Sequence, residues 1–276
     1  MKIAGDGNLK IQMDMGDRLR KRGHFEVFSA VIYALFLREV NTRFSSGTLG
    51  YFWVIFEPLM QIAIFVTVKL ALFGSSSNMD YALFITVGFI AFNLFRHIVD
   101  RSMSAFNSNR GLYAYKQVKP IDGLIARVLV EILISVIIAL IFLLVALYMG
   151  RDIGVENLGM VLFGFLWLVV FAFGFGLFIA VIGVFFDSFL KVIKLILSPL
   201  MFISAVFYPM QNLPQSLQNI LYFNPLAHFI EMIHSNFFFE LDGHFIDYDY
   251  ILFWTLTPLY FGLFFYRKLE KRIISK

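Results

Sequence analysis

Long apolar runs separated by short polar segments are the dominant pattern of this chain. A helix needs about 20 apolar residues to cross the hydrocarbon core of a membrane, and six runs approach or exceed that length. The second run is blurred at its end by Asn93, Arg96 and His97, and we expect its helix to continue further. The pattern therefore predicts six transmembrane helices, at residues 53–73, 81–95, 124–149, 158–186, 192–208 and 250–266.

Two further segments are apolar but do not fit a span. Residues 24–44 begin with an apolar stretch too short to cross a membrane and end in REVNTRF, which predicts an amphipathic helix lying in the interface. Residues 209–249 are too apolar for a solvated loop, and loops of this length without structure are uncommon. We expect a hairpin of two short helices that re-enters the membrane where protein surrounds it. Residues 1–23 are polar and predict a flexible cytoplasmic tail.

Composition excludes a soluble domain. The chain has 276 residues, of which 59% are hydrophobic and only 15% are charged, whereas soluble domains average roughly 45–50% apolar and about 25% charged residues. The fold class is therefore predicted to be an all-α polytopic membrane protein. The sequence contains no cysteine, which excludes a disulfide framework and a zinc-thiolate site.

Positive charge is concentrated in four parts of the chain. Of the 23 Lys and Arg residues, 21 lie in residues 1–52, 96–127, 187–194 and 267–276, whereas residues 209–249 contain none and hold five acidic residues. Cytoplasmic loops carry such an excess of Lys and Arg, so both termini are expected in the cytoplasm and residues 209–249 in the periplasm. The net charge of +4 follows from this topology and does not indicate nucleic-acid binding.

Two patterns inside the spans predict helix contacts. Arg127 and Glu131 are four residues apart and can pair on one helix face. Ala172, Gly176 and Ala180 also recur every four residues, which permits close approach of another helix. That helix is either a neighbour within the subunit or the same face of a second copy.

The best candidate for a metal site is the sequence His228-x-x-Glu231-x-x-His234, whose spacings place the three side chains near one helix face. A di-iron centre, however, needs a second Glu-x-x-His motif and further glutamates on facing helices. We therefore predict a structural or gating role and no metal. The sequence has no G-x-x-x-x-G-K-[ST] phosphate loop, so a nucleotide-driven motor would be another polypeptide.

The segment LREVNTRFSSGTLGYFWVIFEPL, residues 37–59, resembles the signature at the start of type-2 ABC exporter permeases. The match is carried by Arg38, Glu39, Arg43, Phe44, Leu49, Gly50, Trp53 and Pro58. Two more blocks, NRGLYAYKQVKPIDGLIARVLVE and FNPLAHFIEMIH, resemble the permeases of group 2 capsular polysaccharide exporters. The resemblance covers nearly everything after about residue 25, and it departs from the family pattern at His234, where an arginine is expected.

The resemblance implies a type-2 ABC permease domain over residues 45–276 that moves lipid-linked capsular polysaccharide across the bacterial inner membrane. It implies a homodimer with two copies of a separate ABC ATPase, which uses ATP and Mg²⁺, while this chain is not an enzyme and holds no cofactor. Periplasmic adaptor and outer-membrane polysaccharide export proteins are further partners, and the cargo is a lipid-linked acidic polysaccharide. Two alternatives stay open: another cargo (O-antigen, teichoic acid or a small amphiphile), or a membrane enzyme such as an acyl- or glycosyltransferase.

The resemblance also implies a coupling helix at about residues 107–121, between the second and third spans, which contacts the ATPase. The sequence fits this role, with a possible cap at 107–109, contact surfaces at Tyr113 and Tyr115, and an end at Pro120. The coupling residues are Asn109, Gly111, Leu112, Tyr113, Tyr115, Lys116, Lys119 and Pro120. The alternative is a positively charged loop that binds lipid headgroups.

Cargo is expected to meet the permease on the cytoplasmic side. Arg38 and Arg43 are predicted to bind the phosphate of the lipid, because a planar guanidinium matches a phosphate group. Tyr51, Trp53 and Phe56 are predicted to offer flat faces to sugar rings. Alternatively, the arginines only anchor the interfacial helix and the aromatic residues form an interface belt. In the periplasmic hairpin the candidate residues are Asn224, Pro225, His228, Glu231 and His234.

Overall fold

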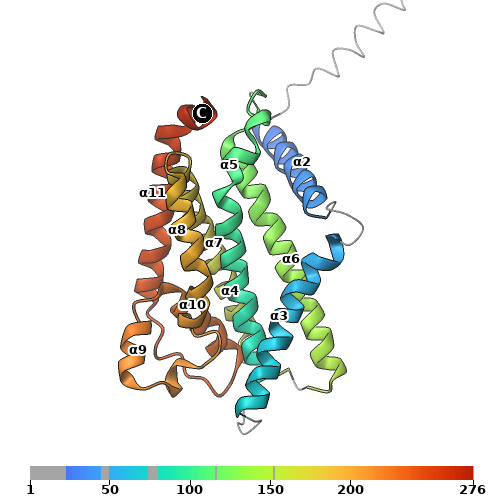
Figure 1. The fold of residues 1–276 in the computed structure, drawn as a ribbon, viewed down its shortest axis with the longest axis vertical. Helices are drawn as coiled ribbons and strands as arrows, with labels where there is room; N and C mark the ends of the chain where they lie inside the picture. The colour runs from blue at the N-terminus through green and yellow to red at the C-terminus, as the bar shows by residue number, and fades with distance from the viewer. Residues whose placement is uncertain (1–22, 45–49, 74–79, 116, 152, 276) are drawn as a thin grey trace, which may run out of the picture.

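The computed structural model describes residues 23–44, 50–73, 80–115, 117–151 and 153–275, and all regular secondary structure within them is helical. The elements are α2 (His24–Phe44), α3 (Gly50–Phe73), α4 (Tyr81–Met103), α5 (Ala105–Ser108), η1 (Arg110–Leu112), α6 (Pro120–Tyr148), α7 (Leu158–Gly183), α8 (Asp187–Leu200), η2 (Met201–Ile203), η3 (Met210–Asn212), α9 (Gln215–Leu221), α10 (Pro225–Phe237) and α11 (Tyr248–Ser275). Figure 1 shows the long helices running side by side as a bundle.

Helix α4 is the best covered of the three long apolar helices α4, α6 and α7. Of its most apolar stretch, 78% is buried inside the molecule, compared with 50% for α7 and 28% for α6. Stacked aromatic rings fill the space between α4 and its neighbours: Phe171 of α7 lies 5.4 Å from Phe95 of α4 and 5.1 Å from Phe229 of α10, measured between ring centroids. Such offset-stacked pairs add to the free energy gained from burial alone.

Glycine allows α7 to cross α11 at short range. A Cβ atom added to Gly174 would lie 2.9 Å from the backbone of Leu259, and one added to Gly262 would lie 3.1 Å from the amide nitrogen of Phe178. Small residues at helix crossings inside membranes permit this kind of backbone contact. The apolar pattern of the sequence does not predict this crossing.

The predicted row of small residues on α7 faces α4. Ala172 and Ala180 are buried, and a Cβ added to Gly176 would lie 2.6 Å from the Ser102 hydroxyl of α4. The row therefore serves packing within the subunit, which confirms the first of the two interpretations drawn from the sequence.

The helix lengths fit an all-α polytopic membrane protein. Among the described residues α4, α6 and α7 are long and apolar enough to cross a membrane. Helices α3 and α11 contain 24 and 28 residues, and at a rise of about 1.5 Å per residue these lengths also exceed the roughly 30 Å of a hydrocarbon core. Helix α4 continues past the polar residues that blur its sequence and ends at Met103, as expected.

The prediction of a continuous fifth helix over residues 192–208 is wrong. Helix α8 already begins at Asp187, ends at Leu200, and is followed by the short η2 helix and irregular structure. Pro199 in its last turn has no amide hydrogen to donate, and Ala205 has a φ of 57°, which lies outside the right-handed helical region. The sixth predicted stretch is too short, because α11 continues to Ser275.

The segment at 209–249 contains two short α-helices, α9 and α10, as predicted. Asn224 caps α10 by accepting a hydrogen bond from the Leu226 amide at 3.0 Å, and Pro225 occupies the first helical position, where its missing amide hydrogen costs nothing. Helix α9 lies at the opposite end of the bundle from α5 and the C-terminus of α11 (Figure 1). Helix α10, which the Asn-Pro pair begins, packs against α4 and α7.

Helix α2 has the bounds that the sequence predicts, residues 24–44. It lies against α6 (Figure 1) and buries Leu35 and Glu39. Phe25 and Tyr33 remain 79% and 64% exposed. The contacts of α2 with the bundle therefore run through its second half, where the signature residues lie.

Candidate functional site

Two buried ion pairs join α2 to α6. The Glu39 carboxylate lies 3.3 Å from the Arg127 guanidinium, and Arg43 pairs with Glu131. All four side chains are at most 12% exposed. Glu39 and Arg43 are four residues apart on α2, as are Arg127 and Glu131 on α6, so each helix presents one acid and one base on a single face. The two faces meet with opposite charges aligned.

The expected pairing of Arg127 with Glu131 inside α6 is therefore wrong, because each of them binds a partner on α2. Arg127 also donates hydrogen bonds to the carbonyl of Arg101 at 2.7 Å and to the hydroxyl of Ser104 at 2.8 Å. The last carbonyl groups of a helix have no partner within that helix. Arg127 satisfies one of them and so ties the end of α4 to both α2 and α6.

Arg38 connects α2 to the segment that follows α4. Its guanidinium donates to the Asn109 side-chain oxygen, and the Asn109 side-chain nitrogen donates to the Ala105 carbonyl at 2.9 Å. Asn109 is 2% exposed and lies against Gly123 of α6, where an added Cβ would be 2.2 Å from its nitrogen. Asn109 is thus held by α2, α5 and α6 together.

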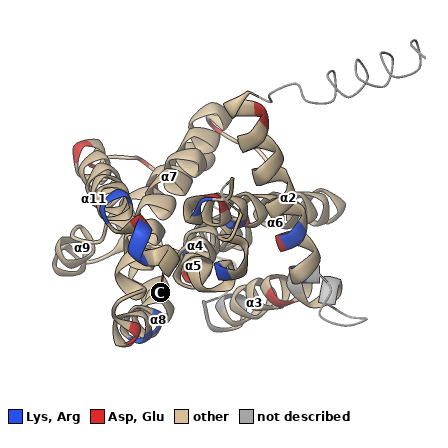
Figure 2. Cartoon of the chain, turned by 90° about the horizontal axis from the view of Figure 1, so that it is seen from above, with Lys and Arg blue, Asp and Glu red and all other residues tan. Residues whose placement is uncertain are grey.

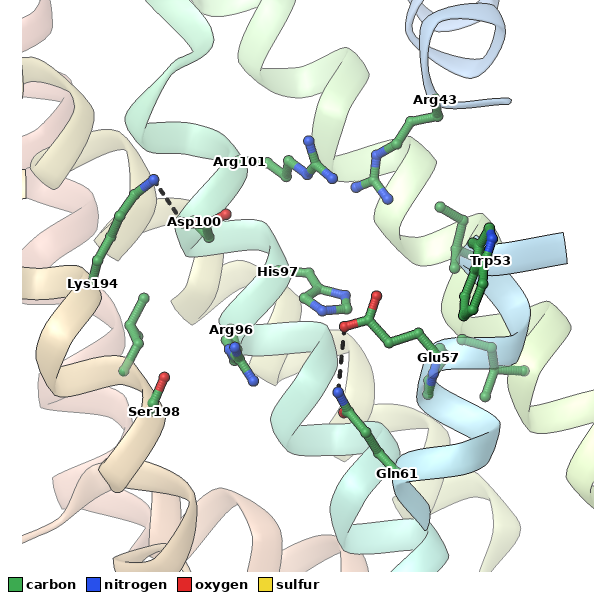
Figure 3. Close-up of a pocket in the computed structure, with 14 residues that line it drawn as sticks. Arg43, Trp53, Glu57, Gln61, Arg96, His97, Asp100, Arg101, Lys194 and Ser198 are labelled. Atoms are coloured by element: carbon green, nitrogen blue, oxygen red, sulfur yellow. Dashed lines mark hydrogen bonds and ion pairs between the residues drawn. The ribbon is translucent and has the colours of Figure 1, made fainter. Parts of the chain in front are cut away.

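A cavity of about 490 Å³ lies beside the Arg43–Glu131 pair. Figure 3 shows side chains reaching into it from α3, α4 and α8, with Arg43 entering from the end of α2. Its lining consists of Arg43, Trp53, Glu57, Pro58, Gln61, Arg96, His97, Asp100, Arg101, Ile134, Ile138, Lys194, Leu197 and Ser198. Five helices therefore contribute to one polar space inside an otherwise apolar bundle.

The cavity is electropositive. Lys194 lies 3.4 Å from Asp100, so these two charges compensate one another, and Glu57 accepts a hydrogen bond from Gln61 at 3.4 Å. Arg43 and Arg101 extend toward one another above His97 (Figure 3). Viewed from above, Lys and Arg positions lie on several helices of the bundle (Figure 2). The lining holds four cationic side chains and two carboxylates, namely Arg43, Arg96, Arg101 and Lys194 with Glu57 and Asp100, a set suited to an anion with several oxygen atoms.

The structure brings two of the predicted cargo residues into this cavity. Arg43 and Trp53 line it, and Trp53 is 56% exposed. Phe56 lies 5.7 Å from the Trp53 ring in an edge-to-face arrangement. Arg38 is not among the lining residues, since it is directed to the coupling segment. The side chain of Tyr51 lies outside the described residues.

The predicted coupling helix over 107–121 is not one helix. The described residues form α5, which ends at Ser108, and then η1 over Arg110–Leu112. Asn109 does not cap a helix from its N-terminal side, because its side chain bonds back to Ala105. Pro120 starts α6 instead of ending a coupling helix, and the Asp122 carboxylate accepts a hydrogen bond from the Lys119 amide at 2.8 Å to fix that start.

The two tyrosines of this segment face opposite ways. Tyr113 is 9% exposed and donates a hydrogen bond to the Phe106 carbonyl at 3.0 Å, and burial raises its pKa to about 12. The prediction that Tyr113 offers a contact surface is therefore wrong. Tyr115 is 67% exposed, and Gly111 and Lys119 are also exposed, while Leu112 is half-buried. Lys116 lies outside the described residues.

A family model described as ABC-2 type transporter matches residues 30–238 of the chain, which include the signature, the cavity and α10. The chain belongs to the ABC-2 type transporter family. It is 33% identical over 259 residues to the polysialic acid transport protein KpsM of Escherichia coli, covering 92% of this chain and 99% of that protein.

Two further relatives of this ABC-2 type transporter are named for capsule export. The capsule polysaccharide export inner-membrane protein CtrC of Neisseria meningitidis serogroup A is 27% identical over 234 residues, which are 84% of this chain and 88% of CtrC. The capsule polysaccharide export inner-membrane protein BexB of Haemophilus influenzae is 25% identical over 262 residues, which are 95% of this chain and 99% of BexB.

The histidine and glutamate motif of this transporter lies on α10 without converging on one point. His228 bonds to the Tyr222 carbonyl at 2.7 Å, whereas His234 bonds to the Phe84 carbonyl at 3.1 Å and stacks on the Phe84 ring. Glu231 is fully buried between them. No group of three or more His, Asp or Glu side chains in the described part of the chain is arranged to hold a metal ion.

Most of the polar residues of the site are not predicted from the sequence. Arg96 and His97 only blur the end of an apolar run, and Lys194 only adds to the cytoplasmic positive charge. A usable signal existed, since Arg96 and Asp100 are four residues apart, as are His97 and Arg101, which places each pair near one face of a helix. Which helix that face meets could not be read from the spacing.

Proposed function

We propose that this chain is the permease subunit of an ATP-driven exporter that moves a lipid-linked acidic capsular polysaccharide across the bacterial inner membrane. The observation that carries this proposal is the electropositive cavity of about 490 Å³ that Arg43, Arg96, Arg101 and Lys194 line. The proposal is supported by the similarity to KpsM over 92% of the chain and by the capsule-export names of CtrC and BexB.

The proposed topology has six spans, the fifth being the interrupted stretch of α8 and η2, with both termini and α5 in the cytoplasm. It is supported by the distribution of Lys and Arg and by the position of α5 and the C-terminus at one end of the bundle, opposite α9 (Figure 1). Helix α2 then lies at the cytoplasmic interface. Helices α9 and α10 form the re-entrant periplasmic hairpin, in which Asn224 and Pro225 start α10.

In this proposal the lipid phosphate enters the cavity between Arg43 and Arg101, and Arg96 of the same lining donates to it as a third cation. Arginine binds a phosphate through two parallel hydrogen bonds, and the partly dry setting strengthens both. Trp53 and Phe56 then offer edges and faces to the first sugar rings. Arg38, by contrast, holds α2 to the coupling segment, so its proposed role is anchoring.

A second copy of the chain is proposed to cover α8. This helix lines the cavity with Lys194 on one side, while on the other side Leu195 and Ile196 are 76% and 49% exposed. Adjacent Val192 is 52% exposed. A homodimer that buries this apolar face would place two cavities in one complex.

The remaining partners follow from the exporter proposal. Two copies of a separate ABC ATPase, which use ATP and Mg²⁺, bind beneath α5 and η1, and periplasmic adaptor and outer-membrane proteins carry the polymer onward. Another anionic polymer could use the same cavity, so a panel of purified cargoes distinguishes capsule from O-antigen or teichoic acid. A membrane enzyme has less support, because His228 and His234 are engaged with backbone carbonyls of different elements.

Removing one cavity charge tests the proposal. Arg96→Gln is expected to reduce surface polysaccharide by roughly tenfold or more, because a hydrogen bond to a charged group contributes about 1.5–3 kcal/mol and each 1.4 kcal/mol is about tenfold in affinity. Polymer should accumulate in the cytoplasm. Both quantities are measured in cells that produce the polymer but lack the native permease.

Arg151→Gln is the matched control, since it removes an arginine whose side chain is 51% exposed and pairs with Asp80 at the opposite end of α4. It should export normally. Normal export by the Arg96→Gln variant, at equal amounts of permease in the membrane, would show that the cavity is not part of the transport route.

Tyr115 tests the coupling segment. Exposed aromatic side chains that become buried in an interface typically contribute about 2 kcal/mol or more, so Tyr115→Ala is expected to weaken co-purification of the ATPase subunit by roughly 30-fold. The matched control is Tyr113→Phe, which removes only the buried hydroxyl bonded to Phe106. If Tyr115→Ala retains its ATPase as the wild type does, the contact lies elsewhere.

A further inference from the structure

Glu131 lies behind the wall of the cavity. It is 1% exposed, and it is not among the lining residues. One of its carboxylate oxygens pairs with Arg43 and lies 3.8 Å from the Nε atom of Arg101. The other lies 3.7 Å from the His97 ring nitrogen and has no hydrogen-bond partner among the described residues. All three neighbours line the cavity. The Glu131 carboxylate therefore contacts these lining residues from the side that points away from the cavity.

An anion in the cavity would compete with Glu131. Arg43 and Arg101 are the two guanidinium groups that extend toward one another there (Figure 3), and both are within reach of the Glu131 carboxylate. A guanidinium that binds a phosphate or carboxylate in the cavity shares its donors between the two acids. Anion binding and the Arg43–Glu131 contact are therefore linked. If an anion weakens that contact, then breaking the contact makes the cavity bind the anion more tightly.

Helix α2 connects the Arg43–Glu131 contact to the coupling segment. Arg43 lies in its last turn, and Arg38, five residues earlier on the same helix, donates to Asn109. Asn109 in turn bonds to Ala105 at the start of α5. A shift of α2 relative to α6 therefore changes the Arg38–Asn109 contact, and that contact lies directly before η1 and the exposed Tyr115.

We propose that Glu131 is a cargo-sensing counter-ion. In the empty transporter it holds Arg43 and keeps α2 seated on α6. When an anionic group of the cargo takes over Arg43 and Arg101, the last turn of α2 is released and the helix pivots on the remaining Glu39–Arg127 pair. The Arg38–Asn109 contact then passes the change to the segment that stimulates the ATPase. Glu131 is a positioning residue in this scheme because it does not touch cargo. The inference rests on the proposed function, namely anion binding in the cavity.

The test uses the full-length permease with its ATPase subunit in phosphatidylcholine vesicles. ATP hydrolysis is measured alone, with phosphatidylglycerol in the vesicles, and with soluble polysialic acid, so that a lipid phosphate and a polymer carboxylate are distinguished. The wild type is expected to be stimulated about fivefold or more, the usual lower range of coupling between two sites. Glu131→Gln should hydrolyse ATP without either anion at the stimulated rate and gain little from their addition.

Two variants control this result. Glu26→Gln removes a carboxylate from the exposed start of α2, where it accepts a hydrogen bond from the Gly23 amide at 3.2 Å, and should behave as the wild type does. Arg96→Gln reports on the cavity itself: if it binds and responds to both anions normally, the proposed function fails. If Arg96→Gln loses the response while Glu131→Gln keeps a low basal rate and full stimulation, only the role of Glu131 is overturned.

A distance measurement keeps the proposal testable if Glu131→Gln does not assemble. The chain contains no cysteine, so Asn41→Cys on α2 and Leu133→Cys on α6 give two exposed labelling positions on a functional transporter. Spin labels at these positions should report a change in the α2–α6 distance when the stimulating anion is added. An unchanged distance alongside stimulated ATP hydrolysis would overturn the release of α2.

Discussion

Gly174→Ala is expected to separate α7 from α11 and to destabilise the whole bundle. The added methyl group would lie 2.9 Å from the Cα and amide nitrogen of Leu259, and backbone cannot move aside as the end of a side chain can. Overpacking of this kind typically costs about 1–3 kcal/mol. For a chain of this size each kcal/mol lowers the melting temperature by roughly 2–4 °C. A thermal shift assay on the purified permease should therefore show a loss of about 2–12 °C.

Gly159→Ala, near the start of the same helix, is the matched control. An added Cβ there meets only the Asn157 side chain, at an ordinary contact distance of 3.5 Å. Alanine favours a helix by up to about 1 kcal/mol over glycine, so this variant should be unchanged or slightly more stable. If both variants melt at the wild-type temperature, the close crossing of α7 and α11 does not contribute to stability.

Elements with a continuous apolar signal were predictable from the sequence. The bounds of α2 agree with the predicted 24–44, and α4, α6 and α7 lie where the apolar runs are. The fifth predicted span failed because hydropathy reports burial and not backbone conformation. Residues 201–208 are as apolar as a span, yet Pro199 and the left-handed Ala205 interrupt the helix. The Pro was visible in the sequence, but its effect depends on the neighbouring turn.

Of the candidate site, Arg43 and Trp53 were predicted and do line the cavity. Asn224 and Pro225 were predicted only as residues of the hairpin, although the cap that they form uses adjacent residues and local spacing. The pairing of Arg127 with Glu131 was inferred from the same kind of local spacing and was wrong, because Glu39 and Arg43, more than eighty residues earlier, compete for both charges. Four-residue spacing identifies a charged face, and tertiary contacts then decide what that face binds.

Arg127→Met is expected to have the largest effect on folding among the variants considered. It leaves the Glu39 carboxylate buried without its partner and removes the hydrogen bonds to the Arg101 carbonyl and the Ser104 hydroxyl. Removing one member of a buried ion pair costs about 3–5 kcal/mol, because the remaining charge stays in a medium of low dielectric constant. Little assembled permease should be recovered from membranes, measured by size-exclusion chromatography at equal expression.

A double variant separates the ion pair from the hydrogen bonds that Arg127 also makes. Glu39→Gln removes the charge that Arg127→Met would strand, so Glu39→Gln with Arg127→Met should be more stable than Arg127→Met alone, with a coupling of about 0.5–3 kcal/mol. Arg151→Met controls for the loss of an arginine, since its pair with Asp80 is half exposed and such pairs contribute only about 0–1 kcal/mol. If Arg127→Met is no more harmful than Arg151→Met, the α2–α6 ion pairs are not what holds the signature helix in place. If the double variant is as unstable as Arg127→Met, the hydrogen bonds to the end of α4 dominate instead.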